Sequence, residues 1–86
     1  MSKVTLEIAV FSVQSALDAI QAGAHRIELC ENPNEGGTTP SYGSLLAMSK
    51  QQTVPVFPII RPRGGDFLYT DIEYQIMKQD VQVAEE

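Results

Sequence analysis

The sequence predicts an α/β fold made of three consecutive strand–helix units. Segments with the two-residue alternation of a β-strand recur along the chain, and each is followed by apolar residues at helical spacing. Turn-forming Ser, Gly, Pro and Asn residues separate these segments. Successive units of this kind give a parallel sheet with right-handed connections. Ligands of α/β proteins collect beyond the carboxyl ends of such strands.

The first unit is a strand over residues 4–10 and a helix that begins after Ser12. The strand has Leu6, Ile8 and Val10 on one face and Thr5, Glu7 and Ala9 on the other. Ser12 is a suitable N-cap, and the helix that follows has one apolar face formed by Val13, Ala16, Leu17 and Ile20. Gly23 provides the left-handed residue that ends many helices.

The second unit starts with a strand over residues 26–30, which places Ile27 and Leu29 opposite a polar face of Arg26, Glu28 and Cys30. Residues 31–40 are rich in Pro, Asn and Gly and predict a loop longer than usual at this place. Long loops often carry function. Helical spacing then returns in Tyr42, Leu45, Leu46 and Ser49.

The third unit combines a strand over residues 54–60 with a helix that begins near Thr70. Pro58 cannot donate a ladder hydrogen bond, so we expect a bulge or irregular pairing there. Thr70 and Glu73 form a capping box, and the helix has an apolar face of Ile72, Ile76, Met77, Val81 and Ala84. The sequence then stops without a glycine or a further strand, so residues 1–86 are interpreted as part of one domain.

Composition excludes several functional classes. The chain has 86 residues with 6 basic and 11 acidic side chains, a net charge of −5, which argues against binding to nucleic acid or anionic membranes. No apolar stretch approaches the roughly 20 residues of a membrane span, and no signal-peptide core is seen. The single cysteine, Cys30, excludes an intrachain disulfide and favours a reducing, cytoplasmic location.

Glu7 and Glu28 lie on the polar faces of neighbouring predicted strands. Two carboxylates so placed could share a proton or a cation, and burial together with like charge would raise the pKa of one of them for acid/base catalysis. The alternative is that Arg26 or Arg61 neutralises them in a structural ion-pair network.

The third strand leads into a candidate anion site. Arg61 and Arg63, with the backbone amides of Gly64 and Gly65, offer donors for a phosphate or carboxylate. Against this, the sequence matches no known phosphate-binding fingerprint, and Asp66 could pair with an arginine.

Cys30 is a possible ligand for a soft metal such as copper(I), with Met48 or Met77 as thioether partners. The methionines fall in helical segments, where methionine more often fills a core. A lone buried cysteine is more often a small apolar residue.

Several stretches resemble the CutC copper-homeostasis proteins. They are residues 6–8, 23–30, 35–41 and 58–67, the last reading Pro-Ile-Ile-Arg-Pro-Arg-Gly-Gly-Asp-Phe. The resemblance implies a (β/α)8 TIM barrel, about 250 residues when complete, of which this chain holds the first three βα units. It also implies a cytoplasmic protein of copper tolerance with an unsettled activity. Its implied sites are Glu7, Glu28, Cys30, Arg61, Arg63 and Asp66.

Two functions therefore remain open at this point. One is copper handling, in which Cys30 binds Cu(I) with ligands from the rest of the barrel. The other is an enzyme acting on a small anionic metabolite, with Arg61 and Arg63 binding the anion and Glu7 or Glu28 moving a proton. The unpaired strand edges of an isolated three-unit piece predict association with the remainder of the barrel or with a second copy.

Overall fold

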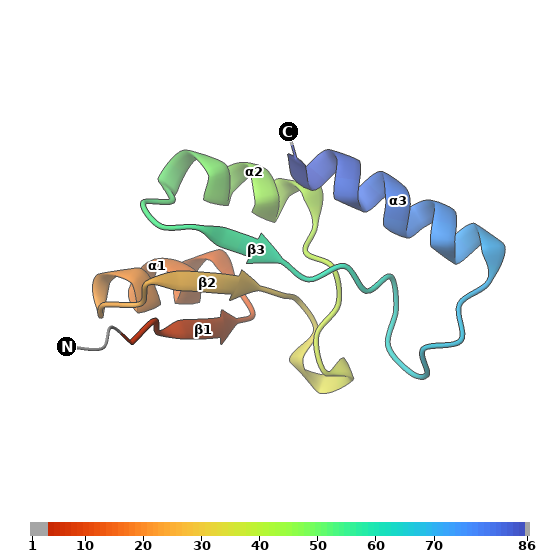
Figure 1. The fold of residues 1–86 in the computed structure, drawn as a ribbon, viewed down its shortest axis with the longest axis horizontal. Helices are drawn as coiled ribbons and strands as arrows, with labels where there is room; N and C mark the ends of the chain where they lie inside the picture. Colours follow the sequence, from red (N-terminus) through yellow and green to blue (C-terminus); the bar gives the residue numbers. More distant parts are fainter. Residues whose placement is uncertain (1–3, 86) are drawn as a thin grey trace.

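The computed structural model describes residues 4–85 and confirms the order of three strand–helix units (Figure 1). Residues 1–3 and 86 of the predicted domain lie outside this range. The elements are β1 (Glu7–Val10), α1 (Val13–Gln21), β2 (Arg26–Leu29), the 3-10 helix η1 (Pro33–Glu35), α2 (Tyr42–Gln51), β3 (Val56–Pro58) and α3 (Asp71–Glu85).

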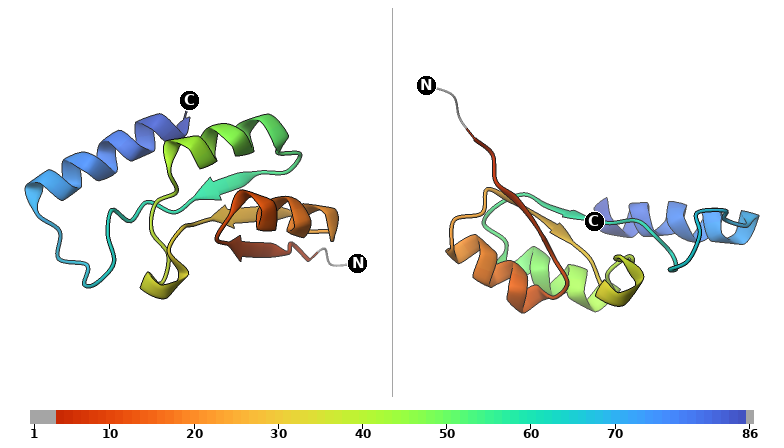
Figure 2. Two further views of the ribbon diagram at one scale, coloured as in Figure 1. Left: turned by 180° about the vertical axis from the view of Figure 1, so that it is seen from behind. Right: turned by 90° about the horizontal axis from the view of Figure 1, so that it is seen from below.

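The strands form a parallel sheet in the order β1-β2-β3, as predicted. Ile8 pairs with Ile27, and Ile27 with Val56, so these apolar residues share one face of the sheet. Helices α1 and α2 both lie on that side (Figure 2). The opposite face is not covered by a helix of the described chain.

The core lies between the sheet and helices α1 and α2. Its buried members are Val10, Ala16, Ala24, Ile27, Leu29 and Met48. Full burial of a side chain the size of Ile27 or Leu29 contributes about 1.5–3 kcal/mol. Met48 therefore has the core role that its helical position predicted.

Side-chain caps fix where the helices begin. The Ser12 hydroxyl accepts from the Ser15 backbone N–H at 3.1 Å, which confirms the predicted cap of α1. At α3, Glu73 accepts from the Thr70 backbone N–H at 2.9 Å, and the Thr70 hydroxyl accepts from the Glu73 N–H at 3.2 Å. The predicted capping box is thus present in both directions. Gly23 follows α1 with a φ of +112°, as its predicted role requires.

The two outer strands are shorter than predicted. Regular pairing begins at Glu7 rather than at residue 4, and β3 covers three residues instead of seven. The predicted irregularity at Pro58 is wrong, because Pro58 pairs in register with Leu29. The N–H of Ile59 donates to the Leu29 carbonyl at 3.0 Å, so the nitrogen of Pro58 faces the outer edge of the strand, where a proline is tolerated.

Helix α3 stands apart from the sheet (Figure 1). None of its residues is buried, and Ile72 is 71% exposed. The apolar face predicted for this helix is therefore present but largely uncovered within the described residues, apart from Ala84 at its end, which lines a cavity with residues of α2 and β3.

Candidate functional site

Two loops meet at the carboxyl ends of the strands. The chain leaves β2 through residues 30–41, which include η1, and leaves β3 through residues 59–70 (Figure 1). Met48 lies in α2 and Met77 in α3. The candidate residues other than Glu7, Met48 and Met77 lie in these loops or within two residues of the end of β2. Sequence reasoning placed them at this end of the sheet, and the structure does so too.

Cys30 and Glu28 form a pair at the end of β2. Cys30 is 3% exposed, and its Sγ lies 3.6 Å from Glu28 Oε1, within donating distance. Burial, the negative charge of Glu28 and this hydrogen bond together raise the pKa of Cys30 from 9.0 to about 11. The thiol is therefore protonated at neutral pH, and a metal would have to displace its proton.

Few side chains in this part of the chain are placed to bind a metal ion. Within residues 4–85, no group of three or more His, Cys, Asp and Glu side chains is placed to hold a metal ion. Met48, proposed as a thioether partner, lies in the core under the sheet. These residues alone do not make a complete copper(I) site.

Glu7 and Glu28 share the uncovered face of the sheet but contact different partners. The register pairs Glu7 with Arg26 and Glu28 with Ala9 and Phe57. Glu7 Oε1 lies 3.3 Å from Arg26 Nε, an ion pair with both side chains well exposed. The structural alternative predicted for Glu7 is thus present, and an exposed pair of this kind contributes at most about 1 kcal/mol.

The guanidinium of Arg61 binds backbone carbonyls of both loops. Nη1 donates to the carbonyl oxygens of Glu35 and of Gly37, the latter at 3.0 Å, and Nη2 donates to the Gly65 carbonyl at 3.0 Å. The Phe67 ring covers the group, with its centroid 4.9 Å from Cζ. Most donors that were predicted to bind an anion are used to hold the loops together.

Arg63 is engaged even more fully, in the segment that leads to α3. It donates to the carbonyls of Gly64, Asp66 and Leu68, and it forms ion pairs with the carboxylates of Glu73 and Asp66. The predicted pairing of Asp66 with an arginine is present at 3.4 Å. Anion binding by this arginine stays a prediction that requires exchange of these bonds.

The glycines of the two loops allow close approach of backbone and side chains. Gly36, Gly37 and Gly65 have φ values of +79°, +100° and +81°, which favour glycine. A Cβ at Gly64 would collide with the Glu35 carboxylate. This carboxylate next to Gly64 opposes binding of an anion by the neighbouring amides.

Sequence reasoning missed the residues that shape the first loop. Asn32 has a φ of +56°, and its side-chain amide donates to Thr38 Oγ1 at 2.7 Å. Glu31 accepts from the Ser41 backbone N–H at 2.9 Å at the start of α2. Asn before Pro, and a serine ahead of a helix, are local signals that could have indicated both features.

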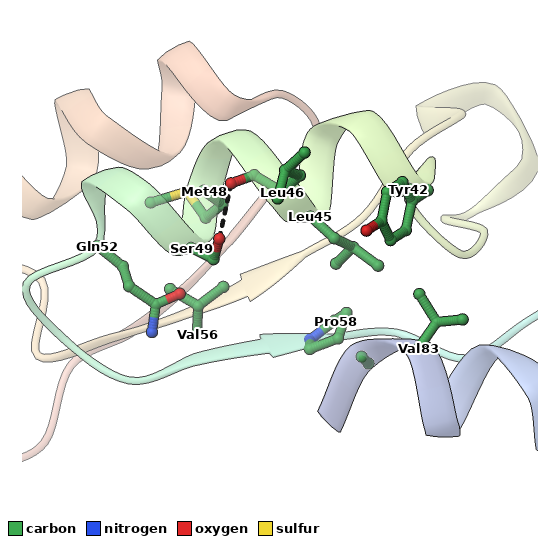
Figure 3. A pocket seen from close by; sticks show the side chains of 10 residues that line it. Tyr42, Leu45, Leu46, Met48, Ser49, Gln52, Val56, Pro58 and Val83 are labelled. Carbon is green, nitrogen blue, oxygen red and sulfur yellow. Dashed lines mark hydrogen bonds between the residues drawn. The ribbon is translucent and has the colours of Figure 1, made fainter. Parts of the chain in front are cut away.

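A separate cavity of about 130 Å³ lies between α2, β3 and the end of α3 (Figure 3). Its lining is mainly apolar and consists of Tyr42, Leu45, Leu46, Met48, Ser49, Gln52, Val56, Pro58, Val83 and Ala84. The Ser49 hydroxyl donates to the Leu46 carbonyl at 2.7 Å, the bond drawn in Figure 3. Of the predicted site residues, Met48 alone lines this cavity, where it is part of the apolar core.

No helix within residues 4–85 combines the length and the apolar character needed to cross a bilayer.

Comparison with known proteins gives consistent matches. The profile of the CutC family matches residues 4–86. A CutC family protein of Photorhabdus laumondii is 59% identical over 76 residues, which are 88% of this chain and 31% of that protein. The human copper homeostasis protein cutC homolog is 53% identical over 79 residues, 92% of this chain and 29% of that protein.

The fold comparison agrees with the sequence comparison. The crystal structure of CutC from Streptococcus agalactiae superposes with a TM-score of 0.85 at 36% identity, over 96% of this chain and 41% of that chain. This supports the predicted α/β fold and is consistent with part of a (β/α)8 barrel. The chain spans about a third of the length of the curated relatives it matches.

Proposed function

The chain belongs to the CutC family, and from this we propose that it supplies the first three βα units of a (β/α)8 barrel that acts in copper homeostasis in the cytoplasm. The observation that carries the proposal is the family match over residues 4–86. The name of the human relative supports the link to copper homeostasis. The one free cysteine of the chain supports a reducing compartment.

We place the contribution of this part of the barrel to copper handling at Cys30. A thiolate is a preferred ligand of Cu(I), and Cys30 lies at the end of the sheet where barrel proteins bind their ligands. Glu28 is within reach of the thiol and could accept its proton when a metal ion arrives. Any further thiolate has to come from the rest of the barrel, because residues 4–85 hold one cysteine.

A growth assay tests the proposed role. A bacterial strain that lacks its own CutC gene is complemented with the full-length protein or with its Cys30→Ser variant, and growth is measured at rising copper concentrations. We expect the wild-type protein to restore copper tolerance and Cys30→Ser to restore less of it.

Ser49→Ala is a matched control for this assay. It removes a hydroxyl on α2 that bonds within its own helix, away from Cys30, and should behave like the wild type. If the wild-type protein is produced but tolerance does not change, the proposed role is wrong.

A further inference from the structure

We propose that Arg61 is a latch that holds residues 31–39, here called the cysteine loop, closed over the thiol of Cys30. The role is one of positioning, and it differs from the anion binding that the sequence predicted for this arginine. Through contacts within this chain, Arg61 limits access to the thiol.

The cysteine loop covers the thiol through Gly37. A Cβ built on Gly37 would lie 3.5 Å from Cys30 Cβ, 3.6 Å from its Sγ and 3.7 Å from the Phe11 ring. These are ordinary van der Waals distances for a Cβ that glycine lacks, so Gly37 lies beside the cysteine side chain with about the space of one methyl group between them. Since Cys30 is 3% exposed, a reagent or a metal ion reaches its sulfur after this part of the loop moves.

The guanidinium of Arg61 fixes this covering part of the loop. Its bonds to the Glu35 and Gly37 carbonyls lie on either side of Gly36. A Cβ on Gly36 would sit 3.3 Å from Arg61 Nη1, so the loop approaches the guanidinium closely because glycine stands there. The third bond, to Gly65, and the Phe67 ring hold the guanidinium from the other loop.

Other bonds hold the ends of the cysteine loop. Glu31 and Thr38 exchange two backbone hydrogen bonds of 3.0 and 2.8 Å. Thr39 donates to the Arg61 carbonyl at 2.9 Å and accepts from its N–H through Oγ1 at 2.7 Å. Between these ends, Glu35, Gly36 and Gly37 donate backbone hydrogen bonds of 3.0–3.1 Å to Asn32 and Pro33 within the loop. The Arg61 side chain is what ties this stretch to the loop after β3.

The test measures how fast Cys30 is alkylated by iodoacetamide in the folded full-length protein, with the modified peptide quantified by mass spectrometry. Arg61→Lys keeps the charge but cannot reach three carbonyls at once. A bond to a charged donor contributes about 1.5–3 kcal/mol, so we expect Cys30 to react about tenfold faster or more in this variant.

Arg26→Lys is the matched control, because Arg26 pairs with Glu7 at the start of β2 and contacts neither of the two loops. It should leave the alkylation rate of Cys30 unchanged. An equal rate for wild type and Arg61→Lys overturns the proposal, and so does an equal acceleration by the two lysine variants. The dependence of the Cys30 alkylation rate on denaturant gives a further check. If this rate rises with denaturant as steeply as global unfolding does, the proposal is also overturned, because a local opening of the loop exposes little surface.

A second variant keeps the proposal testable if Arg61→Lys does not fold. Phe67 is 70% exposed, so Phe67→Leu leaves the core intact and removes the ring that covers the guanidinium. A cation–π contact at an exposed site is worth about 0.5–1 kcal/mol, which predicts alkylation about two- to fivefold faster. An unchanged rate in this variant counts against the latch. Alkylation by iodoacetamide does not require copper, so the latch and the copper role can fail separately.

Discussion

Replacement of Glu28 by glutamine is expected to make the Cys30 thiol more acidic without opening the loop above it. Glu28 raises the pKa of Cys30 through its charge and through a hydrogen bond, and both effects act together with burial. Glutamine has nearly the same size, so the packing around the thiol is kept. The reactive species is the thiolate, and Glu28→Gln should therefore speed alkylation at a fixed pH.

The size of the expected rate increase follows from the causes that raise the pKa of Cys30. A pKa of about 11 in place of 9.0 leaves about a hundredfold less thiolate at neutral pH. Burial is the largest cause and persists in the variant. The variant should thus recover only part of this factor, and we expect a rate about three- to tenfold higher.

The assay is the alkylation rate of Cys30 as a function of pH, from about 7 to about 10, in the full-length protein. In Glu28→Gln the profile should move toward lower pH. Glu7→Gln is the control, because Glu7 lies on the same face of the sheet but pairs with Arg26, and its profile should match the wild type. An unmoved profile in Glu28→Gln, or the same displacement in both variants, refutes the reasoning.

Three further predictions concern stability and are checked by denaturant unfolding of the full-length protein. Ile27→Ala should lower the free energy of unfolding by about 2–5 kcal/mol, because Ile27 is fully buried at the centre of the sheet; a loss below about 1 kcal/mol would contradict this core. Gly64→Ala should cost at most about 1 kcal/mol, because the exposed Glu35 side chain can move away from the added methyl group, and a loss above about 2 kcal/mol would contradict this. The Arg63 guanidinium and the Thr70 backbone N–H hold the pKa of Glu73 below its ordinary 4.5. The stabilisation by Glu73 is therefore present above pH 4.5 and lost as the pH falls through its lowered pKa. Glu73→Gln should flatten this acid dependence, and an unaltered pH profile would argue against the ion pair.

Local patterns in the sequence were enough to predict the order of elements. Alternating apolar residues indicated the strands, and the caps at Ser12 and Thr70 indicated where two helices begin. Both kinds of signal depend only on residues a few positions apart in the sequence. The ends of β1 and β3 were harder to predict. Strand length depends on which residues find a partner across the sheet, and β1 and β3 each have one neighbour in the described chain.

The sequence predicted where the candidate residues lie in the fold, but not the groups to which they form hydrogen bonds. The run from Arg61 to Asp66 was placed correctly at the end of β3, since the strand pattern stops there. The partners of Arg61 are 24 and 26 residues away, on the loop after β2, and no local pattern shows that two loops converge. Gly36 and Gly37 lie at this long-range contact. Besides forming a turn, they let the loop approach the Arg61 guanidinium and the Cys30 side chain closely.

The most direct test of a copper role centred on Cys30 is the Cu(I) affinity of the full-length protein, measured by competition with a chromogenic Cu(I) chelator under reducing conditions. The wild type and Ser49→Ala should bind equally, and Cys30→Ser should bind at least about tenfold more weakly, because a thiolate is the soft donor that this part of the barrel supplies. Equal affinity of Cys30→Ser and the wild type would contradict the account.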